Sequence, residues 1–301
     1  MSIIKTEKLT KHFKNVVAVD NLGINVPEGS LYGFLGPNGA GKTTTIKMLT
    51  GFLKPDSGYF EVMGQKVNFG DTSYMQNIGF LPEAPSYYKY MSGQEFLEMC
   101  AHFQKRKTNG IQDLLRNTGL YNVKNRKLGA YSRGMKQRLG IAQALVNDPA
   151  VLILDEPVSA LDPMGRKDIL DMLASLKGSK TIFFSTHILS DVERICDHAA
   201  IINEGKLLLE GSINDISALG GRSRINLEID TVSDVLTKLL NEAPWVQDFT
   251  FEGVQYSIAA NDDKLAGREI PHLLTEADVA LVKYEQSEPT LEDIFVKVVN
   301  G

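Results

Sequence analysis

Short, uninterrupted apolar runs recur along the chain between segments whose apolar positions repeat every three or four residues. Three such runs, SLYGFL at 30–35, AVLIL at 150–154 and TIFF at 181–184, predict strands. Runs without alternation are typical of strands buried on both faces, as in a parallel sheet covered by helices. The segment 165–177 predicts a helix between the last two strands, which makes a βαβ unit.

Other segments of the first 220 residues show helical or alternating patterns. TTTIKML at 43–49 predicts a helix, and the glycine-separated stretches of 56–81 predict antiparallel strands. From Ser92 to about residue 144 the pattern is helical with two glycine breaks. Ser92 and Glu95 have the spacing of a capping box, which marks the start of this helical part.

After Gly220 the pattern changes to shorter elements that alternate between strand and helix. Pro244, Gly253 and Pro271 are expected to separate them, and an amphipathic helix at 290–299 closes the chain. The expected elements are strands at 224–229, 254–259 and 278–284 and helices at 232–241 and 264–275. We therefore expect two domains, residues 1–220 and a small α+β domain at 221–301.

Composition adds limits to this architecture. The chain has 301 residues, 43% hydrophobic and 23% charged, which is a globular mixture and suits about two domains. Two cysteines cannot form a disulfide framework and fit a reducing cytosol. The first residues, MSIIKTEKLTK, carry charges where a signal peptide is apolar, and no apolar run approaches the ~20 residues that span a bilayer. We expect a chain that is not itself a pore, a receptor or a secreted domain.

The charge is uneven along the chain. Residues 221–301 carry 15 acidic and 7 basic side chains, whereas the whole chain has a net charge of −5. Two parts of different charge suggest different partners, although two solvated surfaces would give the same balance. The weakly positive first part lacks the clustered basic face of a nucleic-acid binder, so no nucleic-acid partner is expected.

The strongest chemical signal is GPNGAGKTT, which follows a predicted strand and opens a predicted helix. It matches the phosphate-binding loop (P-loop) G-x-x-x-x-G-K-S/T in full. Its glycines let backbone N–H groups turn toward a phosphate, and the helix start adds positive potential. Lys42 would reach the β- and γ-phosphates of a nucleotide, and the hydroxyl of Thr43 would bind Mg²⁺. The nucleotide-binding residues expected here are Gly36, Pro37, Asn38, Gly39, Ala40, Gly41, Lys42, Thr43 and Thr44.

Two adjacent carboxylates form the second signal. In VLILDEP at 151–157 a buried strand ends in Asp155 and Glu156, at the sheet edge where parallel sheets bind ligands. We expect Asp155 to hold Mg²⁺ and Glu156 to polarise the attacking water. A P-loop with these carboxylates occurs in many nucleotide hydrolases, but the guanine-reading pattern N-K-x-D of small GTPases is absent from the sequence.

The segment YSRGMKQRL at 131–139 narrows the choice among P-loop nucleotide hydrolases. It resembles the L-S-G-G-Q signature of the ATP-binding cassette (ABC) ATPases, with Ser132 and Gly134 at the serine and second glycine. Arg133 departs from the signature, as do the flanking Tyr131 and Met135. The resemblance covers about residues 3–215 and implies an α/β P-loop NTPase cassette. Such a cassette has a parallel-sheet core, an antiparallel β subdomain and a helical signature subdomain.

Further residues take roles from the resemblance alone. Phe13 stands where the family stacks an aromatic ring on adenine, and Glu83 stands near Mg²⁺ where most cassettes carry glutamine. The phrase SALD at 159–162 is similar to the family's D-loop. His187 matches the switch histidine that contacts the γ-phosphate. The resemblance therefore implies Lys42, Glu156 and His187 as the catalytic residues.

The resemblance also implies partners. One P-loop and one signature in a chain imply a head-to-tail dimer of cassettes, most simply two identical copies. The P-loop of one copy and Ser132 and Gly134 of the other would enclose the same ATP, bound with Mg²⁺. The segment APSYYKYMS at 84–92 stands where transporter cassettes meet their membrane subunit. The ending EPTLEDIFVKVV resembles the terminal helix of cassettes from a bacterial exporter class with separate membrane subunits. This implies an ATPase bound peripherally at the cytoplasmic face of the cell membrane.

Two other functions stay open from the sequence. One is a soluble ABC ATPase that acts on ribosomes or nucleic acid, although its usual second cassette or long coiled coil is not seen here. The other is a nucleotide-gated binding module without turnover. The transported substrate is not encoded in this chain, because specificity lies in the membrane subunit.

Overall fold

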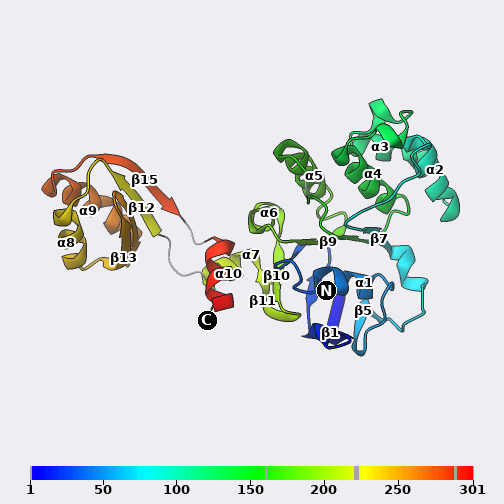
Figure 1. Ribbon diagram of the computed structural model, residues 1–301, viewed down its shortest axis with the longest axis horizontal. Coiled ribbons are helices and arrows are strands. Elements are labelled where there is room, and N and C mark those ends of the chain that lie inside the picture. Colours follow the sequence, from blue (N-terminus) through cyan, green and yellow to red (C-terminus); the bar gives the residue numbers. More distant parts are fainter. Residues whose placement is uncertain (1, 107, 160, 220–223, 288–289, 301) are drawn as a thin grey trace. The chain divides into compact units, whose positions relative to one another are not determined.

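A computed structural model describes residues 2–106, 108–159, 161–219, 224–287 and 290–300 (Figure 1). The chain divides into two compact units, Met1–Ile213 and Asn214–Gly301, and each unit is described by itself. The domain boundary that we expected at Gly220 falls outside the described residues.

A six-stranded sheet with the order β11-β10-β4-β9-β8-β7 forms the centre of the first unit. All neighbouring strands are parallel except β11, which runs antiparallel to β10. Every residue of β4, β8 and β9 is buried, which explains their uninterrupted apolar sequences. The strands are β4 (Leu31–Leu35), β7 (Ile78–Leu81), β8 (Val151–Leu154), β9 (Thr181–Thr186), β10 (His198–Asn203) and β11 (Lys206–Ser212).

The expectation of antiparallel strands over 56–81 is wrong at its C-terminal end. There β7 pairs in parallel with β8, after a 3-10 turn at Ser73–Asn77. As the edge strand, β7 is only alternately buried, so its pattern imitates an antiparallel strand. Gly79 lets this edge approach the next layer, because a Cβ there would lie 2.2 Å from the carbonyl oxygen of Ala144.

A second, antiparallel sheet has the order β2-β1-β5-β6, and β3 also pairs with β1. Helix α1 (Lys42–Leu49) buries Ile46, Met48 and Leu49 in the core that both sheets share. Of this sheet, only the β5 and β6 region was predicted from the sequence. The strands are β1 (Ser2–Phe13), β2 (Val16–Leu22), β3 (Asn25–Pro27), β5 (Ser57–Val62) and β6 (Gln65–Lys66).

Helices form the remaining part of the first unit. The predicted capping box is present, because Ser92 Oγ accepts the N–H of Glu95 at 3.2 Å and Glu95 Oε2 accepts the N–H of Ser92 at 2.6 Å. It begins α2 (Gly93–Phe103), which packs with α3 (Ile111–Asn117) and α4 (Arg133–Leu145) around a separate apolar cluster. Two helices follow strands of the central sheet, α5 (Pro163–Ser175) and α6 (Leu189–Ile195).

The second unit contains a four-stranded sheet with the order β13-β14-β12-β15, in which all pairs are antiparallel. Chain order β-α-β-β-α-β with this strand order is the split βαβ, or ferredoxin-like, arrangement. Helices α8 and α9 bury Leu236 and Ile270 against Tyr256 and Ile258 of the sheet. The elements are α7 (Ile213–Leu219), β12 (Arg224–Ile229), α8 (Asp234–Glu242), β13 (Val246–Glu252), β14 (Gln255–Ala260), α9 (Asp263–Glu276), β15 (Leu281–Ser287) and α10 (Leu291–Asn300).

Pro271 was expected to separate elements, but it lies inside α9. The helix continues because Ala266, Ile270 and Leu274, spaced four residues apart, bury one stripe in the core of the unit. Proline removes one helical hydrogen bond, a cost of about 3 kcal/mol that this burial offsets. Strand β13 was also missed, because most of its residues are exposed and give little pattern.

Candidate nucleotide-binding and catalytic site

The phosphate loop lies between β4 and α1 and has the backbone that its glycines allow. Gly39 and Gly41 take φ values of 86° and 103°, in the left-handed region. A Cβ on Gly41 would lie 2.4 Å from the carbonyl oxygen of Ala18, so only glycine fits. Gly41 caps α1 without a side-chain hydrogen bond, which keeps this helix start open toward a phosphate.

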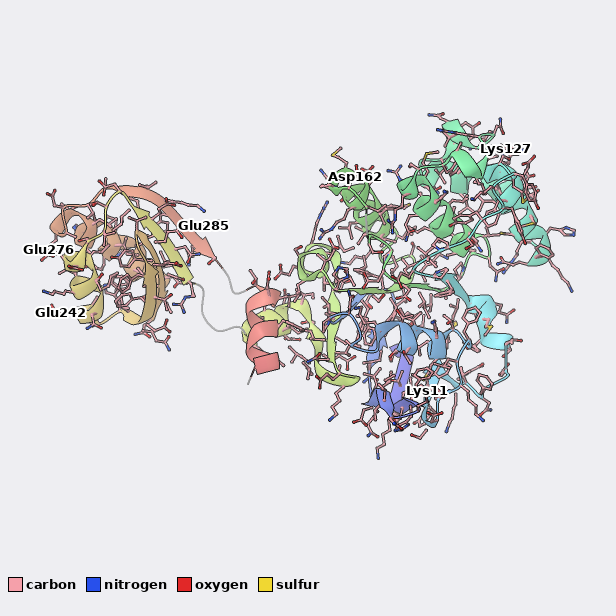
Figure 2. All side chains as sticks on the ribbon, viewed as in Figure 1. Lys11, Lys127, Asp162, Glu242, Glu276 and Glu285 are labelled. Carbon is pink, nitrogen blue, oxygen red and sulfur yellow. The ribbon has the colours of Figure 1, made fainter. Side chains whose placement is uncertain are left out.

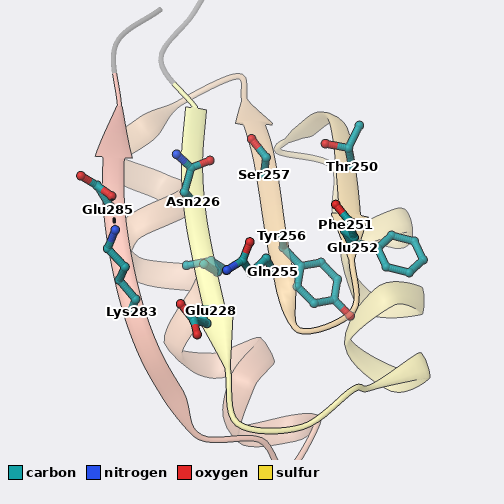
Figure 3. Close-up of a pocket in the computed structure, with 11 residues that line it drawn as sticks. Asn226, Glu228, Thr250, Phe251, Glu252, Gln255, Tyr256, Ser257, Lys283 and Glu285 are labelled. Carbon is teal, nitrogen blue, oxygen red and sulfur yellow. Dashed lines mark hydrogen bonds and ion pairs between the residues drawn. The ribbon is translucent and has the colours of Figure 1, made fainter.

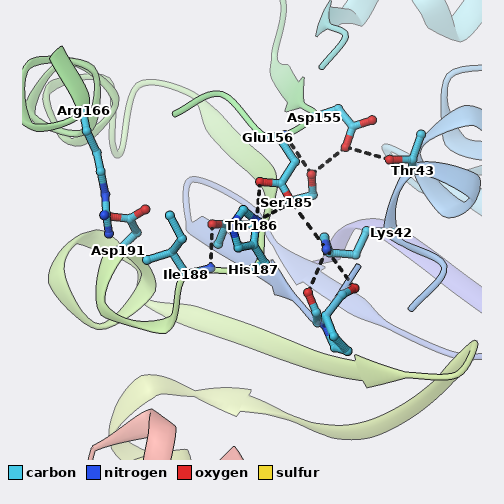
Figure 4. Close-up of polar contacts among 12 residues, drawn as sticks. Lys42, Thr43, Asp155, Glu156, Arg166, Ser185, Thr186, His187, Ile188 and Asp191 are labelled. Atoms are coloured by element: carbon cyan, nitrogen blue, oxygen red, sulfur yellow. Dashed lines mark hydrogen bonds and ion pairs between the residues drawn. The ribbon is translucent and has the colours of Figure 1, made fainter. Parts of the chain in front are cut away.

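Lys42 is buried, and its ammonium group faces the loop and the carboxylates (Figure 4). Lys42 Nζ donates to the carbonyl oxygens of Gly36 at 2.7 Å and Pro37 at 3.2 Å. It also lies 3.4 Å from Glu156 Oε1. A buried positive charge held at the mouth of the loop is suited to an anionic phosphate chain.

Asp155 follows the end of β8 and reaches the start of α1. Its Oδ1 accepts hydrogen bonds from Ser185 Oγ at 2.6 Å and Thr43 Oγ1 at 3.3 Å. Ser185 Oγ also accepts the N–H of Glu156 at 2.9 Å, so it fixes both carboxylate residues. Sequence reasoning missed Ser185, although a serine that ends the apolar run TIFFS beside β8 was the available signal.

Glu156 has a strained backbone and a buried carboxylate. Its φ of 49° lies in the left-handed region that residues with a side chain rarely adopt. His187 Nδ1 lies 3.0 Å from Glu156 Oε2 and 3.2 Å from Oε1. When Nδ1 donates to this carboxylate, Nε2 points away from it as the second polar atom of the ring. Glu156 thus lies between the cations of Lys42 and His187 when the histidine is protonated.

A cavity of about 640 Å³ opens at this point, a size suited to a nucleotide. It brings together most residues that the sequence singled out. Its lining also contains four residues that the sequence did not single out by role: Glu204, and Val16, Val17 and Ala18 of β2. The full lining is Val16, Val17, Ala18, Asn38, Gly39, Gly41, Lys42, Thr43, Thr44, Glu83, Glu156, Ser159, His187 and Glu204.

Six of the expected ATP-contacting residues are not among the residues lining this cavity: Phe13, Gly36, Pro37, Ala40, Ser132 and Gly134. Asp155, expected to hold Mg²⁺, is not in the lining either. Phe13 is 47% exposed at the end of β1, with Lys11 Nζ 5.6 Å from its ring centroid. Ser132 caps α4 by accepting the N–H of Met135 at 3.2 Å, and Gly134 lies in the first turn of the same helix. Of the D-loop phrase, Ala160 lies outside the described residues.

The residues near Asp155 fit Mg²⁺ rather than a metal held by protein ligands alone. Thr43 offers a hydroxyl and Asp155 a carboxylate, and Glu83 adds an exposed carboxylate on the cavity wall. Mg²⁺ is usually bound through one or two carboxylates together with water and substrate phosphates. Among the described residues no three His, Cys, Asp or Glu side chains converge as a metal site.

A second cavity, of about 470 Å³, lies on the open face of the sheet in the second unit (Figure 3). Glu228, Glu252 and Glu285 line it, and Lys283 Nζ is already bound to Glu285 at 2.6 Å. This negative lining repels phosphates. The cavity at the P-loop is therefore the candidate nucleotide site.

Within the described part of the chain, no helix has the length and apolar character needed to cross a bilayer.

Comparison with known families gives two matches that follow one another along the chain. The family model described as ABC transporter matches residues 19–159. The model described as the C-terminal domain of DrrA1-3-like ATP-binding proteins matches residues 211–299. Both the P-loop unit and the split βαβ unit thus have relatives, and they occur here in the same chain.

Curated relatives align over the whole chain. The bacitracin transport ATP-binding protein BcrA of Bacillus licheniformis is 39% identical over 100% of this chain and 98% of its own length. The uncharacterized ABC transporter ATP-binding protein YxlF of Bacillus subtilis (strain 168) is 36% identical over 99% of this chain and 100% of its own length.

Solved structures share the fold of the first unit. The ABC transporter protein cbiO1 from Clostridium perfringens has a TM-score of 0.66 at 27% identity, covering 81% of this chain and 96% of its own. The dimeric structure of MJ0796, a bacterial ABC transporter cassette, has a TM-score of 0.64 at 26% identity, covering 70% and 98%. The chain therefore belongs to the ABC transporter family, as an ATP-binding subunit that hydrolyses ATP to drive transport.

Proposed function

We propose that this chain powers an exporter as two identical copies bound to an integral membrane subunit at the cytoplasmic face of the membrane. The observation that carries the catalytic part is Glu156, whose buried carboxylate lies 3.4 Å from Lys42 and 3.0 Å from His187. The BcrA relatives, named for bacitracin transport, support a role in transport, and the terminal helix at 291–300, which resembles that of an exporter class, supports export. The absence of a basic face in the sequence argues against a nucleic-acid partner.

ATP would bind with its phosphates in the loop and its base toward β2. Lys42 would leave the carbonyl oxygens of Gly36 and Pro37 to pair with the β- and γ-phosphates, which are stronger acceptors. Phe13 would stack on adenine, with Val16 on the cavity wall beside it. The loop glycines and the start of α1 would supply N–H donors to the phosphates.

Mg²⁺ would be held by the Thr43 hydroxyl and Asp155, with Glu83 facing it directly or through water. Bound there, it would supply positive charge to the β- and γ-phosphates. Ser185 would keep Asp155 oriented, since its hydroxyl donates to Oδ1 at 2.6 Å. An ionised Glu83 accepts hydrogen bonds but does not donate them, so it orients a water only through the water's own protons.

For hydrolysis, Glu156 would accept a proton from the attacking water as that water bonds to the γ-phosphorus. The bond between the γ-phosphorus and the bridging oxygen breaks, and ADP leaves with the electron pair. His187 would hold Glu156 through Nδ1 and donate from Nε2 to the γ-phosphate. Burial of Glu156 and Lys42 makes these charges act in a low dielectric.

The second copy would complete the site. Ser132 and Arg133 are exposed at the start of α4 and lie outside the cavity lining of their own chain. In a head-to-tail pair, Ser132 and Gly134 of one copy would face the phosphates bound by the other. The dimeric MJ0796 cassette supports such a pair. Binding of ATP would then hold the copies together, and hydrolysis would release them.

The membrane subunit would contact the segment before α2. Tyr88 and Tyr90 are 53% and 72% exposed, and their ring centroids lie 5.8 Å apart. Tyr87 is instead packed inward, with its hydroxyl donating to the carbonyl oxygen of Lys136 at 2.8 Å and its ring against Phe96. Exposed tyrosines are typical of interface cores, so Tyr88 and Tyr90 form the contact that we propose.

Replacing Tyr88 with alanine is expected to leave ATP binding and basal turnover of the isolated chain within about twofold, since surface truncations away from a site have small effects. Co-purification with the membrane subunit should fall by about tenfold, as for an interface tyrosine worth 1–2 kcal/mol. Phe103→Ala is the matched control, because Phe103 is 75% exposed at the far end of α2. Equal losses of ATP binding and partner binding in Tyr88→Ala would contradict this division of roles.

A further inference from the structure

A part-buried ion pair lies close to the catalytic residues but has no place in the reaction described above. Asp191 of α6 is 2% exposed, and its Oδ1 accepts Arg166 Nε of α5 at 2.7 Å (Figure 4). A second guanidinium nitrogen of Arg166 lies 2.6 Å from the same oxygen and 3.3 Å from Ser190 Oγ. The pair therefore joins the first turns of two helices, α5 and α6.

Each of these helices follows one catalytic residue along the chain. Glu156 is followed by a turn in which its carbonyl oxygen accepts the N–H of Ser159, and Asp162 then caps α5 by accepting the N–H of Gly165 at 3.2 Å. On the other side, His187 follows β9 and lies two residues before α6. Arg166 thus lies ten residues after Glu156, and Asp191 lies four residues after His187.

The two contacts join the same two chain segments at two places. Glu156 and His187 meet directly at 3.0 Å, and the chains that follow them meet again through Arg166 and Asp191. Next to His187, the N–H of Ile188 donates to Thr186 Oγ1 at 3.0 Å, while Ile188, the N-cap of α6, makes no side-chain cap hydrogen bond. Farther along α6, Val192 and Ile195 are buried and hold the helix against the sheet. The ion pair adds a restraint on the first turn of α6 and, through it, on the direction of the His187 ring.

The Asp191 carboxylate is costly to bury, which argues for a geometric rather than a stabilising role of the pair. Asp191 Oδ2 has no hydrogen-bond partner among the described atoms, and burial raises the pKa of this carboxyl above its usual range. The Arg166 guanidinium opposes that rise in the pKa of Asp191 through its hydrogen bond and its charge. Buried ion pairs add little net stability compared with apolar packing, because their desolvation offsets their attraction.

We propose that Arg166 and Asp191 are positioning residues that hold His187 against Glu156 for the hydrolysis step. The inference rests on the proposed catalytic roles of Glu156 and His187. The ion pair touches neither ATP nor the attacking water. It acts on turnover through the placement of the His187 ring, and it leaves the P-loop and ATP binding unchanged.

The same two helices carry a matched control. Arg194 of α6 pairs with Asp171 of α5 at 2.6 Å, so the second pair joins the same helices with the charges exchanged. The Arg194 and Asp171 side chains are 41% and 53% exposed, and they lie farther along both helices. Exposed pairs are worth about 0–1 kcal/mol, so this pair ties α5 to α6 without fixing the first turn of α6.

The test compares Asp191→Asn with Asp171→Asn in the full chain. Asp191→Asn is expected to lower kcat for ATP about 10- to 100-fold while KM stays within about threefold, the pattern of a misplaced catalytic group. Asp171→Asn should change neither kcat nor KM. Arg166→Gln should show the same loss of kcat, and Arg166→Lys, which retains the charge, should recover part of the activity. Arg166 is partly exposed, so the protein tolerates these exchanges.

A spectroscopic readout separates positioning from general damage. The chain has five histidines, so the ring signals of His187 in an NMR spectrum can be assigned by comparison with His187→Gln. They should shift in Asp191→Asn and stay in place in Asp171→Asn. Wild-type kcat in Asp191→Asn, or lost activity with unmoved His187 signals, would overturn the inference. Activity retained in Glu156→Gln would instead overturn the proposed catalytic site, so the two failures are distinguishable.

Discussion

Glu156→Gln is expected to lower ATP turnover by about 10²- to 10⁴-fold, the usual contribution of a general base. The amide keeps the size of the side chain but cannot accept a proton from the attacking water. It also removes the negative charge that Lys42 and His187 now share at 3.4 and 3.0 Å. ATP binding should persist or tighten, because one buried carboxylate no longer repels the phosphates. ATP turnover and ATP-dependent dimer formation measure the two effects separately.

Asp171→Asn serves as the control for Glu156→Gln, since it removes an exposed carboxylate on α5 outside the cavity. Its turnover should equal that of the wild type. Equal, negligible turnover in wild type and Glu156→Gln would contradict a catalytic role for Glu156 and would favour a nucleotide-gated binding module. A dimer that forms with ATP in Glu156→Gln and dissociates slowly is the expected result.

Lys42→Ala is the second large effect that we expect, this time on binding. The Kd for ATP should rise about 100-fold, which corresponds to roughly 3 kcal/mol for a lost charge-assisted contact. The loss of affinity has two causes. The phosphates lose a buried cation, and they then face the carboxylates of Glu156 and Asp155 with less positive charge to balance them. Titration calorimetry with ATP measures this change directly.

Lys47→Ala is the matched control for Lys42→Ala. Lys47 lies in the last turn of the same helix, α1, and is exposed. Its exchange removes the same charge from the chain at a distance from the loop, so ATP affinity should stay within about twofold, as for ordinary surface changes. Similar losses of affinity in both variants would show that net charge, rather than the position of Lys42, governs binding.

The sequence predicted the central strands and the phosphate loop because both leave strong local patterns. Strands buried on two faces read as uninterrupted apolar runs, and the loop requires glycines at positions with left-handed backbone, such as Gly41. The fold class was confirmed by the structures of related cassettes. The assignment to ABC ATPases was confirmed by the family model and by full-length relatives.

Other features depend on contacts between distant segments and have no local signature. Strand β7 has the alternating pattern of an antiparallel strand, and only its position beside β8 makes it parallel. Helix α9 continues through Pro271 because its other residues pack on the sheet. Ser185 bonds to Asp155, which is 30 positions away, and Asp191 bonds to Arg166, which is 25 positions away. Neither Ser185 nor Asp191 therefore stood out in the sequence.

The left-handed backbone at Glu156 has a consequence for how this protein would respond to selection. A side chain in that conformation costs about 1–3 kcal/mol, which glycine or asparagine would largely recover. Selection for thermal stability alone would therefore favour loss of the carboxylate, whereas selection for transport would restore it. At this position the chain is kept less stable than its fold permits, and an engineered thermostable variant should leave Glu156 untouched.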